Sequence, residues 1–114
     1  MHTILTEQAR IFKVFCVEKR LQILEMLRDG EKCACVLLEK LDLGQPGLSY
    51  HMKVLVESGV VQSRQVGKWT YYKISESGSA HALSLLKELT TPKTVGREEA
   101  RCSNRHCDSQ PMKR

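Results

Sequence analysis

Long apolar stretches and targeting signals are missing from this 114-residue chain. No run of apolar residues approaches the ~18 that a membrane span requires, so a membrane-spanning protein is excluded. The N-terminus has no basic patch followed by an apolar stretch, and we expect no secretory signal. A cytoplasmic protein is the simplest expectation. In that reducing compartment its five cysteines are free thiols unless they serve a metal or redox purpose.

Catalytic signatures are also missing. The chain contains no Gly-rich phosphate loop, no paired carboxylates and no Ser/His/Asp set. A thiol oxidoreductase would carry a Cys-x-x-Cys pair at the opening of a helix after a strand. This chain instead has Cys33-Ala34-Cys35, and no strand is predicted before it. The sequence therefore predicts a protein that is not an enzyme.

Charge is distributed unevenly along the chain. Hydrophobic residues make up 41% and charged residues 27%, as in a globular domain. The net charge is +5, with residues 1–44 neutral, residues 45–75 at +3 and residues 91–114 at +3. A neutral body with a basic internal segment indicates a polyanionic partner, and nucleic acid is the first candidate. A solvated basic face, or a protein that coats nucleic acid without sequence preference, remains an alternative.

Hydrophobic periodicity predicts a mainly α protein with one β-hairpin. The expected order is α-α-α-α-β-β-α, the order of a winged helix-turn-helix, over residues 1–91. Residues 92–114 form a basic, cysteine-containing tail that cannot bury a core of its own and is expected to be flexible. The expected elements are helices at Thr6–Val17, Glu18–Asp29, Cys33–Asp42, 45–58 and from Ser75 or Ser77 to Leu89, with strands at Val60–Val66 and Trp69–Ser75.

The helix at 45–58 is the predicted DNA-recognition helix. A buried stripe includes Leu48, Met52 and Leu55, while Ser, Tyr, His and Lys occupy the rest of the surface, with no acid before Glu57. Such a polar face suits phosphates and base edges. The hairpin tip is also too polar and basic for a core. The predicted DNA contacts are Gln45, Ser49, Tyr50, His51, Lys53, Arg64 and Lys68.

An ordered set of segments resembles the ArsR/SmtB family of arsenic- and metal-responsive repressors. The resemblance spans roughly residues 9–90 and rests on the runs 20–27, 30–35, 45–55, 58–61 and 67–72. The Glu-Lys-Cys-Ala-Cys segment resembles the Glu-Leu-Cys-Val-Cys box of the arsenic- and cadmium-sensing branch. The resemblance implies a homodimer built from the first and last helices and bound to double-stranded operator DNA. The helix at 45–58 would enter the major groove, and an inducer would lower the affinity for DNA.

The resemblance also implies a sensing site at Cys33 and Cys35. In an ideal helix these side chains would point about 200° apart, so one ion can bridge them only where the helix start is distorted or not yet helical. Thiolates favour As(III), Sb(III), Cd or Zn. Relatives often place a third cysteine where this chain has Leu38, so the third thiolate must come from elsewhere or be absent. Cys102 or Cys107 is the candidate, and Cys16 is a less favoured one.

The ligand count leaves several inducers open. As(III) or Sb(III) is the leading expectation, and a methylated As(III) species would fit two thiolates. Cd or Zn would want four ligands and is less favoured. A redox alternative keeps the fold but releases DNA when Cys33 and Cys35 are oxidised.

Overall fold

The structure is a computed structural model that describes residues 2–93. Residues 94–114 fall outside the described residues, so the predicted tail at 92–114, with Cys102 and Cys107, stays a prediction. The elements run in the order α1 (His2–Lys13), the 3-10 helix η1 (Val14–Cys16), α2 (Glu18–Leu27), β1 (Lys32–Cys33), α3 (Ala34–Lys40), α4 (Gln45–Ser58), β2 (Val61–Val66), β3 (Trp69–Ile74) and α5 (Glu76–Thr90).

The structure confirms the winged helix-turn-helix and several predicted bounds. Helix α4 occupies 45–58 as predicted, and the hairpin strands β2 and β3 differ from prediction by one residue at an end. Gly59 ends α4 because it adopts φ +90°, a left-handed conformation that other residues rarely take. Ser75 caps α5, since its hydroxyl oxygen accepts a hydrogen bond from the Gly78 N–H at 3.0 Å.

The predicted bounds of the first three helices are wrong at their ends. Helix α1 begins at His2 rather than Thr6, because the helical apolar pattern continues upstream through Ile4 and Leu5. The chain then tightens into η1, and Val17 turns to extended geometry (φ −119°, ψ 126°) before α2. Helix α2 ends at Leu27, two residues early. Helix α3 is shorter than its predicted span at both ends.

Strand β1 corrects the expectation that no strand precedes the Cys-x-Cys pair. Two residues are too few to produce a sequence pattern, and only their pairing with β3 defines them as a strand. The sheet has the order β1-β3-β2, and both pairings are antiparallel. Strand β3 therefore lies between β1 and β2. We call the hairpin of β2 and β3, residues 61–74, the wing.

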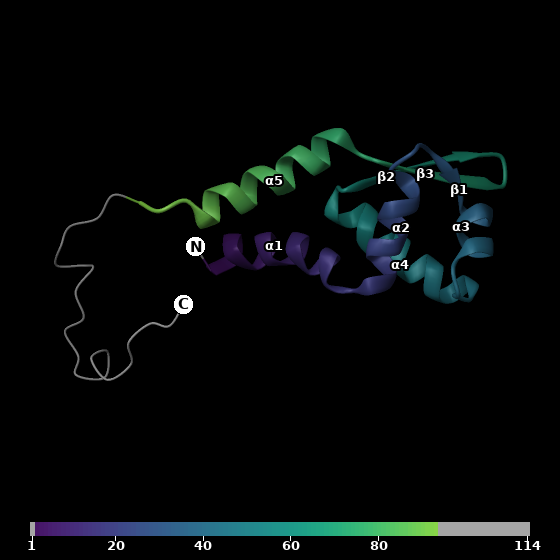
Figure 1. The fold of residues 1–114 in the computed structure, drawn as a ribbon, viewed down its shortest axis with the longest axis horizontal. Helices are drawn as coiled ribbons and strands as arrows, with labels where there is room; N and C mark the ends of the chain where they lie inside the picture. The colour runs from purple at the N-terminus through teal and green to yellow at the C-terminus, as the bar shows by residue number, and fades with distance from the viewer. Residues whose placement is uncertain (1, 94–114) are drawn as a thin grey trace.

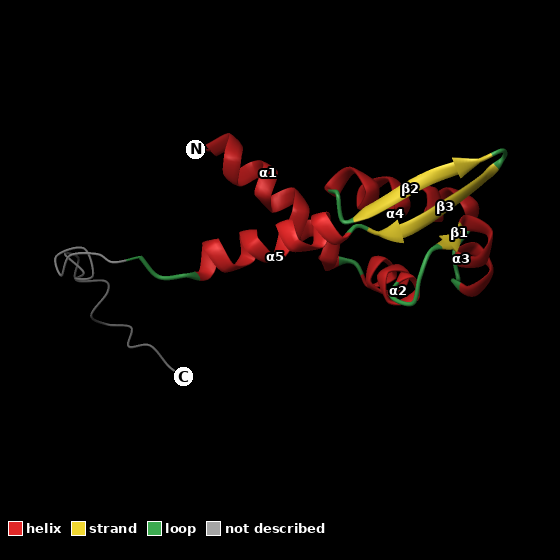
Figure 2. Cartoon of the chain, turned by 90° about the horizontal axis from the view of Figure 1, so that it is seen from above, coloured by secondary structure: helices red, strands yellow, loops and turns green. Residues whose placement is uncertain are grey.

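The core lies between α2, α3, α4 and the sheet at one end of the molecule, while α1 and α5 lie together at the other end (Figure 1; Figure 2). Figure 2 shows the three strands side by side, with β1 at the edge next to β3. Apolar side chains from η1, α2, α3, α4 and β2, and from the residues that flank them, meet in the core. Its buried members are Val14, Ile23, Leu27, Leu37, Leu41, Leu48, Met52, Leu55, Val60 and Val61.

Candidate functional site

The outward face of α4 carries most of the residues predicted to contact DNA. Gly44 is the N-cap of the helix and Pro46 lies in its first turn, where the missing proline N–H costs no hydrogen bond. Three buried apolar side chains fix the opposite side of the helix in the core. Tyr50 is 58% exposed, which leaves a large ring available to a partner. The exposed residues of this recognition face are Gln45, Ser49, Tyr50 and Lys53, and His51 is half-buried.

A buried arginine that sequence analysis missed supports the recognition face. Arg20 of α2 is only 7% exposed, and its Nε donates a hydrogen bond to His51 Nδ1 at 3.2 Å. Its Nη1 donates to the Lys13 carbonyl oxygen at 3.3 Å. The guanidinium carbon also lies 5.8 Å from the centre of the Tyr50 ring. Arg20 therefore positions two adjacent residues that we predicted to contact DNA.

The environment of His51 favours its neutral form. Burial lowers the pKa of His51 below its ordinary value, and the nearby positive charges of Arg20 and Lys19 lower it further. A neutral imidazole that accepts at Nδ1 carries its proton on Nε2, which is then a hydrogen-bond donor. One feature of the sequence could have indicated the Arg20–His51 contact: Arg20 occupies a position in an otherwise apolar stripe of α2.

The two basic residues predicted to contact DNA from the wing have different surroundings. Lys68 lies in the turn after Gly67, which adopts φ +62°, and its Nζ is 5.5 Å from the centre of the Trp69 ring. Arg64 is instead held by an acid: its Nε and Nη2 donate to the Glu31 carboxylate at 2.7 and 2.9 Å. The Arg64 guanidinium also lies 5.1 Å from the centre of the Tyr71 ring.

The cysteines at 33 and 35 form a close sulfur pair. Cys33 is the N-cap of α3 with extended geometry (φ −73°, ψ 146°), and Cys35 lies in the first turn of that helix. The helix start is thus not yet helical at Cys33, and the two sulfur atoms lie 2.8 Å apart rather than on opposite sides. The Cys33 sulfur also accepts the Cys35 N–H at 3.4 Å. We call these two residues the thiol pair.

The two thiols differ in acidity. A hydrogen bond from the Cys35 thiol lowers the pKa of Cys33, and the backbone N–H of Cys35 acts in the same direction. The same thiol contact raises the pKa of Cys35. Cys33 is therefore the first of the two to become a thiolate, the form that binds soft ions and reacts with oxidants.

The remaining cysteines are not brought to the thiol pair in the part of the chain that the structure describes. Cys16 ends η1, is exposed, and donates its S–H to the Phe12 carbonyl oxygen at 3.7 Å. Within the described residues no three His, Cys, Asp or Glu side chains cluster closely enough to hold a metal ion. Cys102 and Cys107 lie outside those residues.

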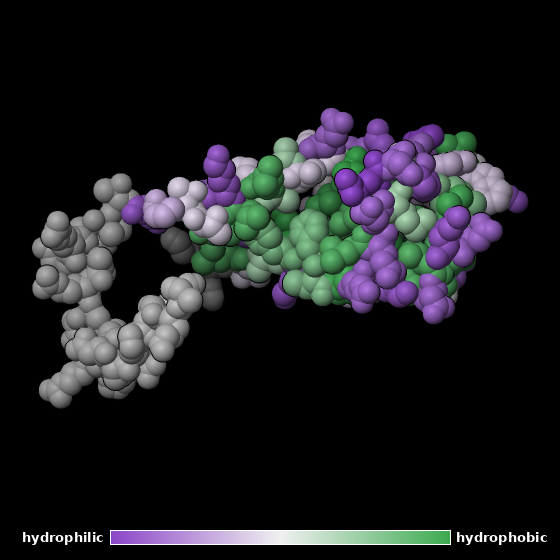
Figure 3. Space-filling view, in the orientation of Figure 1, coloured by the Kyte–Doolittle hydropathy of each residue, from purple (hydrophilic) through white to green (hydrophobic). Residues whose placement is uncertain are grey.

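A second surface, the apolar end face, covers α1 and α5. Figure 3 shows hydrophobic side chains gathered over this end of the molecule. A groove of about 380 Å³ runs between the helices, with Phe12, Phe15, Leu83 and Leu86 among its lining residues. The large exposed apolar side chains of α1, α5 and the adjoining η1 are Ile4, Leu5, Phe15, Leu83, Leu86 and Leu89. A contiguous patch of this kind marks an interaction site.

Comparison with known proteins agrees with this architecture. An uncharacterised HTH-type transcriptional regulator of Methanocaldococcus jannaschii is 35% identical over 82 residues, which cover 71% of this chain and 92% of that protein. The family model described as "Bacterial regulatory protein, arsR family" matches residues 18–63. The chain belongs to the ArsR family. The resemblance found in the sequence is therefore confirmed.

Other ArsR-family relatives are named for arsenical resistance. The arsenical resistance operon repressor of Escherichia coli is 39% identical, with 69% of this chain and 68% of that protein covered. HlyU from Vibrio cholerae has a solved structure that matches with a TM-score of 0.61 and 30% identity, over 81% of this chain and all of that one. The curated relatives and the shared fold are those of DNA-binding transcriptional regulators and not of enzymes. No helix in residues 2–93 is long and apolar enough to span a membrane.

Proposed function

We propose that this ArsR-family protein is a metalloid-responsive repressor, which binds operator DNA as a homodimer and leaves it when As(III) or Sb(III) binds the thiolates of Cys33 and Cys35. The observation that carries the proposal is the 2.8 Å separation of the two sulfur atoms. Thiolates are soft ligands that select soft and borderline ions. Relatives named as arsenical resistance operon repressors, 39% and 41% identical, support an arsenic-type inducer.

The position of the thiol pair supports a link between inducer binding and DNA release. Cys33 ends β1, Cys35 lies in the first turn of α3, and residues 41–44 connect α3 to the recognition helix α4. An ion held by both sulfurs constrains the strand end and the helix start together. If the ion binds a rearranged form of this segment better, it shifts the population toward that form and changes the angle of α4.

The third ligand belongs to the same proposal. Trivalent arsenic and antimony prefer three thiolates, and we assign the third to Cys102 or Cys107, with Cys16 less favoured. A methylated As(III) species would need only the thiol pair. A site of this kind lies within one subunit or between two, depending on which chain supplies the third sulfur.

The recognition face and the apolar end face have different roles in this proposal. The recognition face, with Lys68 and Arg64 of the wing, meets DNA. The predicted DNA contacts remain Gln45, Ser49, Tyr50, His51, Lys53, Arg64 and Lys68. The apolar end face of α1 and α5 meets the same face of a second copy, because a closed two-fold dimer buries both faces at once. Two recognition helices then read the two halves of a palindromic operator.

A redox-responsive repressor of the same fold is the second candidate. The short sulfur–sulfur distance and the lowered pKa of Cys33 also favour oxidation of the pair. A third candidate is a Cd- or Zn-responsive repressor of the same fold, in which the metal ion has additional ligands outside the thiol pair.

The deciding experiment titrates DNA-bound, reduced protein with arsenite and follows release by fluorescence anisotropy. The probe is a duplex from the region upstream of the protein's own coding sequence. Wild-type protein and Cys16→Ser should release it, whereas Cys33→Ser and Cys35→Ser should stay bound. If arsenite released DNA from Cys33→Ser or from Cys35→Ser, the assigned site would be wrong. If arsenite has no effect but peroxide abolishes binding, the redox candidate replaces the proposal, and cadmium and zinc titrations test the remaining one.

X-ray absorption at the arsenic edge then counts the sulfur ligands. Three sulfurs in wild-type protein and two in the Cys102→Ser/Cys107→Ser variant would assign the third thiolate to the C-terminal segment. Three sulfurs in both proteins would move it to Cys16, which the Cys16→Ser variant tests directly.

A further inference from the structure

One row of the sheet connects the thiol pair to the wing. Cys33 of β1 is opposite Tyr71 of β3, and Tyr71 is opposite Arg64 of β2. Residues directly opposite one another in an antiparallel sheet project from the same face. The neighbouring row contains Tyr72, which packs against the core, so the row with Cys33 and Arg64 belongs to the outer face.

Glu31, the residue immediately before the edge strand β1, bridges this outer face to the other edge strand, β2. Glu31 is two residues before Cys33, and its carboxylate accepts hydrogen bonds from Nε and Nη2 of Arg64 at 2.7 and 2.9 Å. A bidentate contact of this kind fixes the direction of the guanidinium as well as its position. Tyr71 lies between the two strands and is 5.1 Å from the same guanidinium. Arg64 is thus held by a residue that lies two positions before the thiol pair in the chain.

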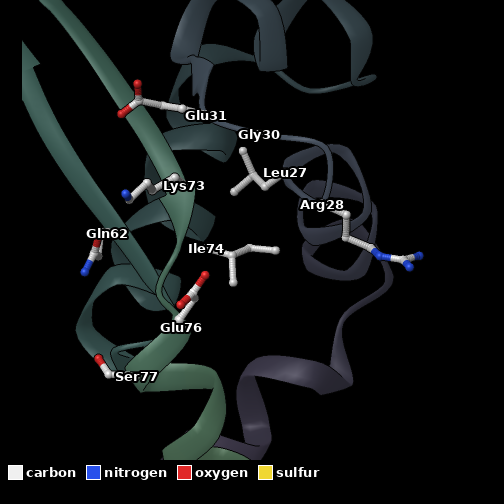
Figure 4. Close-up of a pocket in the computed structure, with 9 residues that line it drawn as sticks. All are labelled: Leu27, Arg28, Gly30, Glu31, Gln62, Lys73, Ile74, Glu76 and Ser77. Atoms are coloured by element: carbon white, nitrogen blue, oxygen red, sulfur yellow. The ribbon is translucent and has the colours of Figure 1, made fainter.

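The surroundings of this ion pair are basic and open to solvent. The Arg64 side chain is 58% exposed, so a phosphate can reach the guanidinium. Figure 4 shows Glu31 and Lys73 projecting from neighbouring positions beside the sheet, with Gln62 on the adjacent strand. A groove of about 500 Å³ is lined by Glu31, Arg64 and Lys73 together with Gln62 and Ser63. Its one carboxylate faces two cations, and without that carboxylate the groove would carry two unopposed positive charges.

We infer that Glu31 competes with DNA for Arg64, and that this competition sets the affinity of the wing for the DNA backbone. A carboxylate and a phosphate offer the same pair of acceptor oxygens to a guanidinium, so Arg64 engages one of them at a time. When Glu31 holds Arg64, the wing loses a phosphate contact. Because Glu31 immediately precedes β1, the two-residue strand that contains Cys33, a change at the thiol pair alters this competition. The inference rests on the proposed DNA-binding role of the wing.

The contrasting interpretation is an ordinary surface ion pair. Most exposed ion pairs contribute little to folding, and one that only supports the sheet would leave DNA affinity unchanged when it is broken. DNA binding therefore separates the two interpretations, whereas thermal stability does not.

The test measures the affinity of full-length reduced protein for two 30-base-pair duplexes, one from the region upstream of its coding sequence and one of scrambled sequence. Glu31→Gln removes the carboxylate charge and keeps the shape of the side chain. We expect it to tighten binding to both duplexes by about fivefold and to steepen the salt dependence by roughly one phosphate contact. The matched control is Glu25→Gln, which removes the same charge from an exposed pair with Arg28 on α2 and should change affinity less than twofold.

A double-variant comparison assigns the effect to Arg64. In the Arg64→Ala background, Glu31→Gln should tighten binding no more than Glu25→Gln does. Circular dichroism of each variant verifies that the fold is retained. The inference would be overturned if Glu31→Gln bound DNA no more tightly than Glu25→Gln, or more weakly than wild-type protein. It would also be overturned if Glu31→Gln tightened binding as much in the Arg64→Ala background as in wild-type protein. Each of these outcomes would leave the proposed function intact. Failure of the wild-type protein to bind either duplex would overturn both.

Discussion

Helices α4 and α5 have nearly the same length, 14 and 15 residues, but they present opposite kinds of surface. Each buries one side in its own chain. The outward side of α4 carries polar groups such as Ser49 and Lys53, whereas α5 leaves Leu83, Leu86 and Leu89 exposed. Polar groups remain solvated until DNA replaces the water, but a row of leucines is favourable only when another apolar surface covers it. The contrast teaches that one small domain provides separate polar and apolar surfaces, which the proposed function assigns to DNA and to a second copy.

The largest expected effect concerns the point where the two helices meet. Gly78 is the third residue of α5, and a Cβ placed on it would lie 1.7 Å from the Gly59 carbonyl oxygen at the end of α4. Gly78→Ala must push the helices apart, and we expect a loss of roughly 3 kcal/mol in the free energy of unfolding, measured by urea denaturation.

The matched control for this variant is the third residue of α4. A Cβ on Gly47 would meet only the Leu43 Cδ2 atom at 3.2 Å, the end of a flexible side chain. Because alanine favours helices over glycine, Gly47→Ala should be neutral or slightly stabilising. Equal stability changes in the two variants would contradict the close approach of α5 to the end of α4.

The next effect tests the apolar end face. Leu86→Glu places a charge in the groove between α1 and α5, where a second copy would bury it without a partner. We expect the dimer dissociation constant to rise at least about 100-fold, measured by analytical ultracentrifugation. Ser84→Glu adds the same charge to the exposed opposite side of α5 and should leave the dimer intact. If both variants dimerise equally well, the apolar end face is not the dimer interface.

A smaller effect tests the recognition face. Lys53→Ala removes an exposed cation from α4, and we expect about tenfold weaker DNA binding with a shallower salt dependence. Lys87→Ala makes the same charge change on α5 and should have little effect, apart from the loss of one charge at long range. Arsenite uptake by both variants should equal that of wild-type protein. A larger loss of DNA affinity in Lys87→Ala would reverse the assignment of the two faces.

The smallest effect concerns pH. Burial and Arg20 lower the pKa of His51 in the folded chain, so the unfolded chain binds a proton first as the pH falls through about 6.5, the ordinary value. Stability from this group is therefore full above pH 6.5 and declines below it. His51→Asn keeps an acceptor near the Nδ1 position and does not titrate. Between pH 7.5 and 5.5, the free energy of unfolding of wild-type protein should fall relative to that of this variant as the pH decreases. A difference that stays constant over this range would refute the lowered pKa of His51.

Local sequence signals predicted the recognition helix better than the first three helices. Proline in the first turn, a stripe of buried residues and Gly59 as a stop gave α4 its observed bounds. The end of α1 has no such stop, and the change to η1 follows from how Val14 packs into the core. The thiol pair was found from the sequence, which also indicated that one ion could bridge the two side chains only where the helix start is distorted or not yet helical. In the structure α3 starts after Cys33, which has extended geometry.

Pairings between distant residues were not predictable from one sequence. Arg20 and His51 are 31 residues apart, and Glu31 and Arg64 are 33 apart. Apart from Arg20, which occupies a position in an apolar stripe of α2, each residue taken alone is consistent with an ordinary solvated surface. The two-residue strand β1 gave no period to detect, so its link to the wing was missed as well.

The amino-acid sequence alone determined the class of fold, the family, the polar character of the outward face of α4 and the presence of a Cys-x-Cys pair, because periodicity, caps and motif spacing are local properties. Tertiary structure decided which side chains meet: the sulfurs at the start of α3, the arginine behind His51, and the acid that holds Arg64. These contacts depend on how the sheet and helices pack, which fixes the distance between residues far apart in the chain.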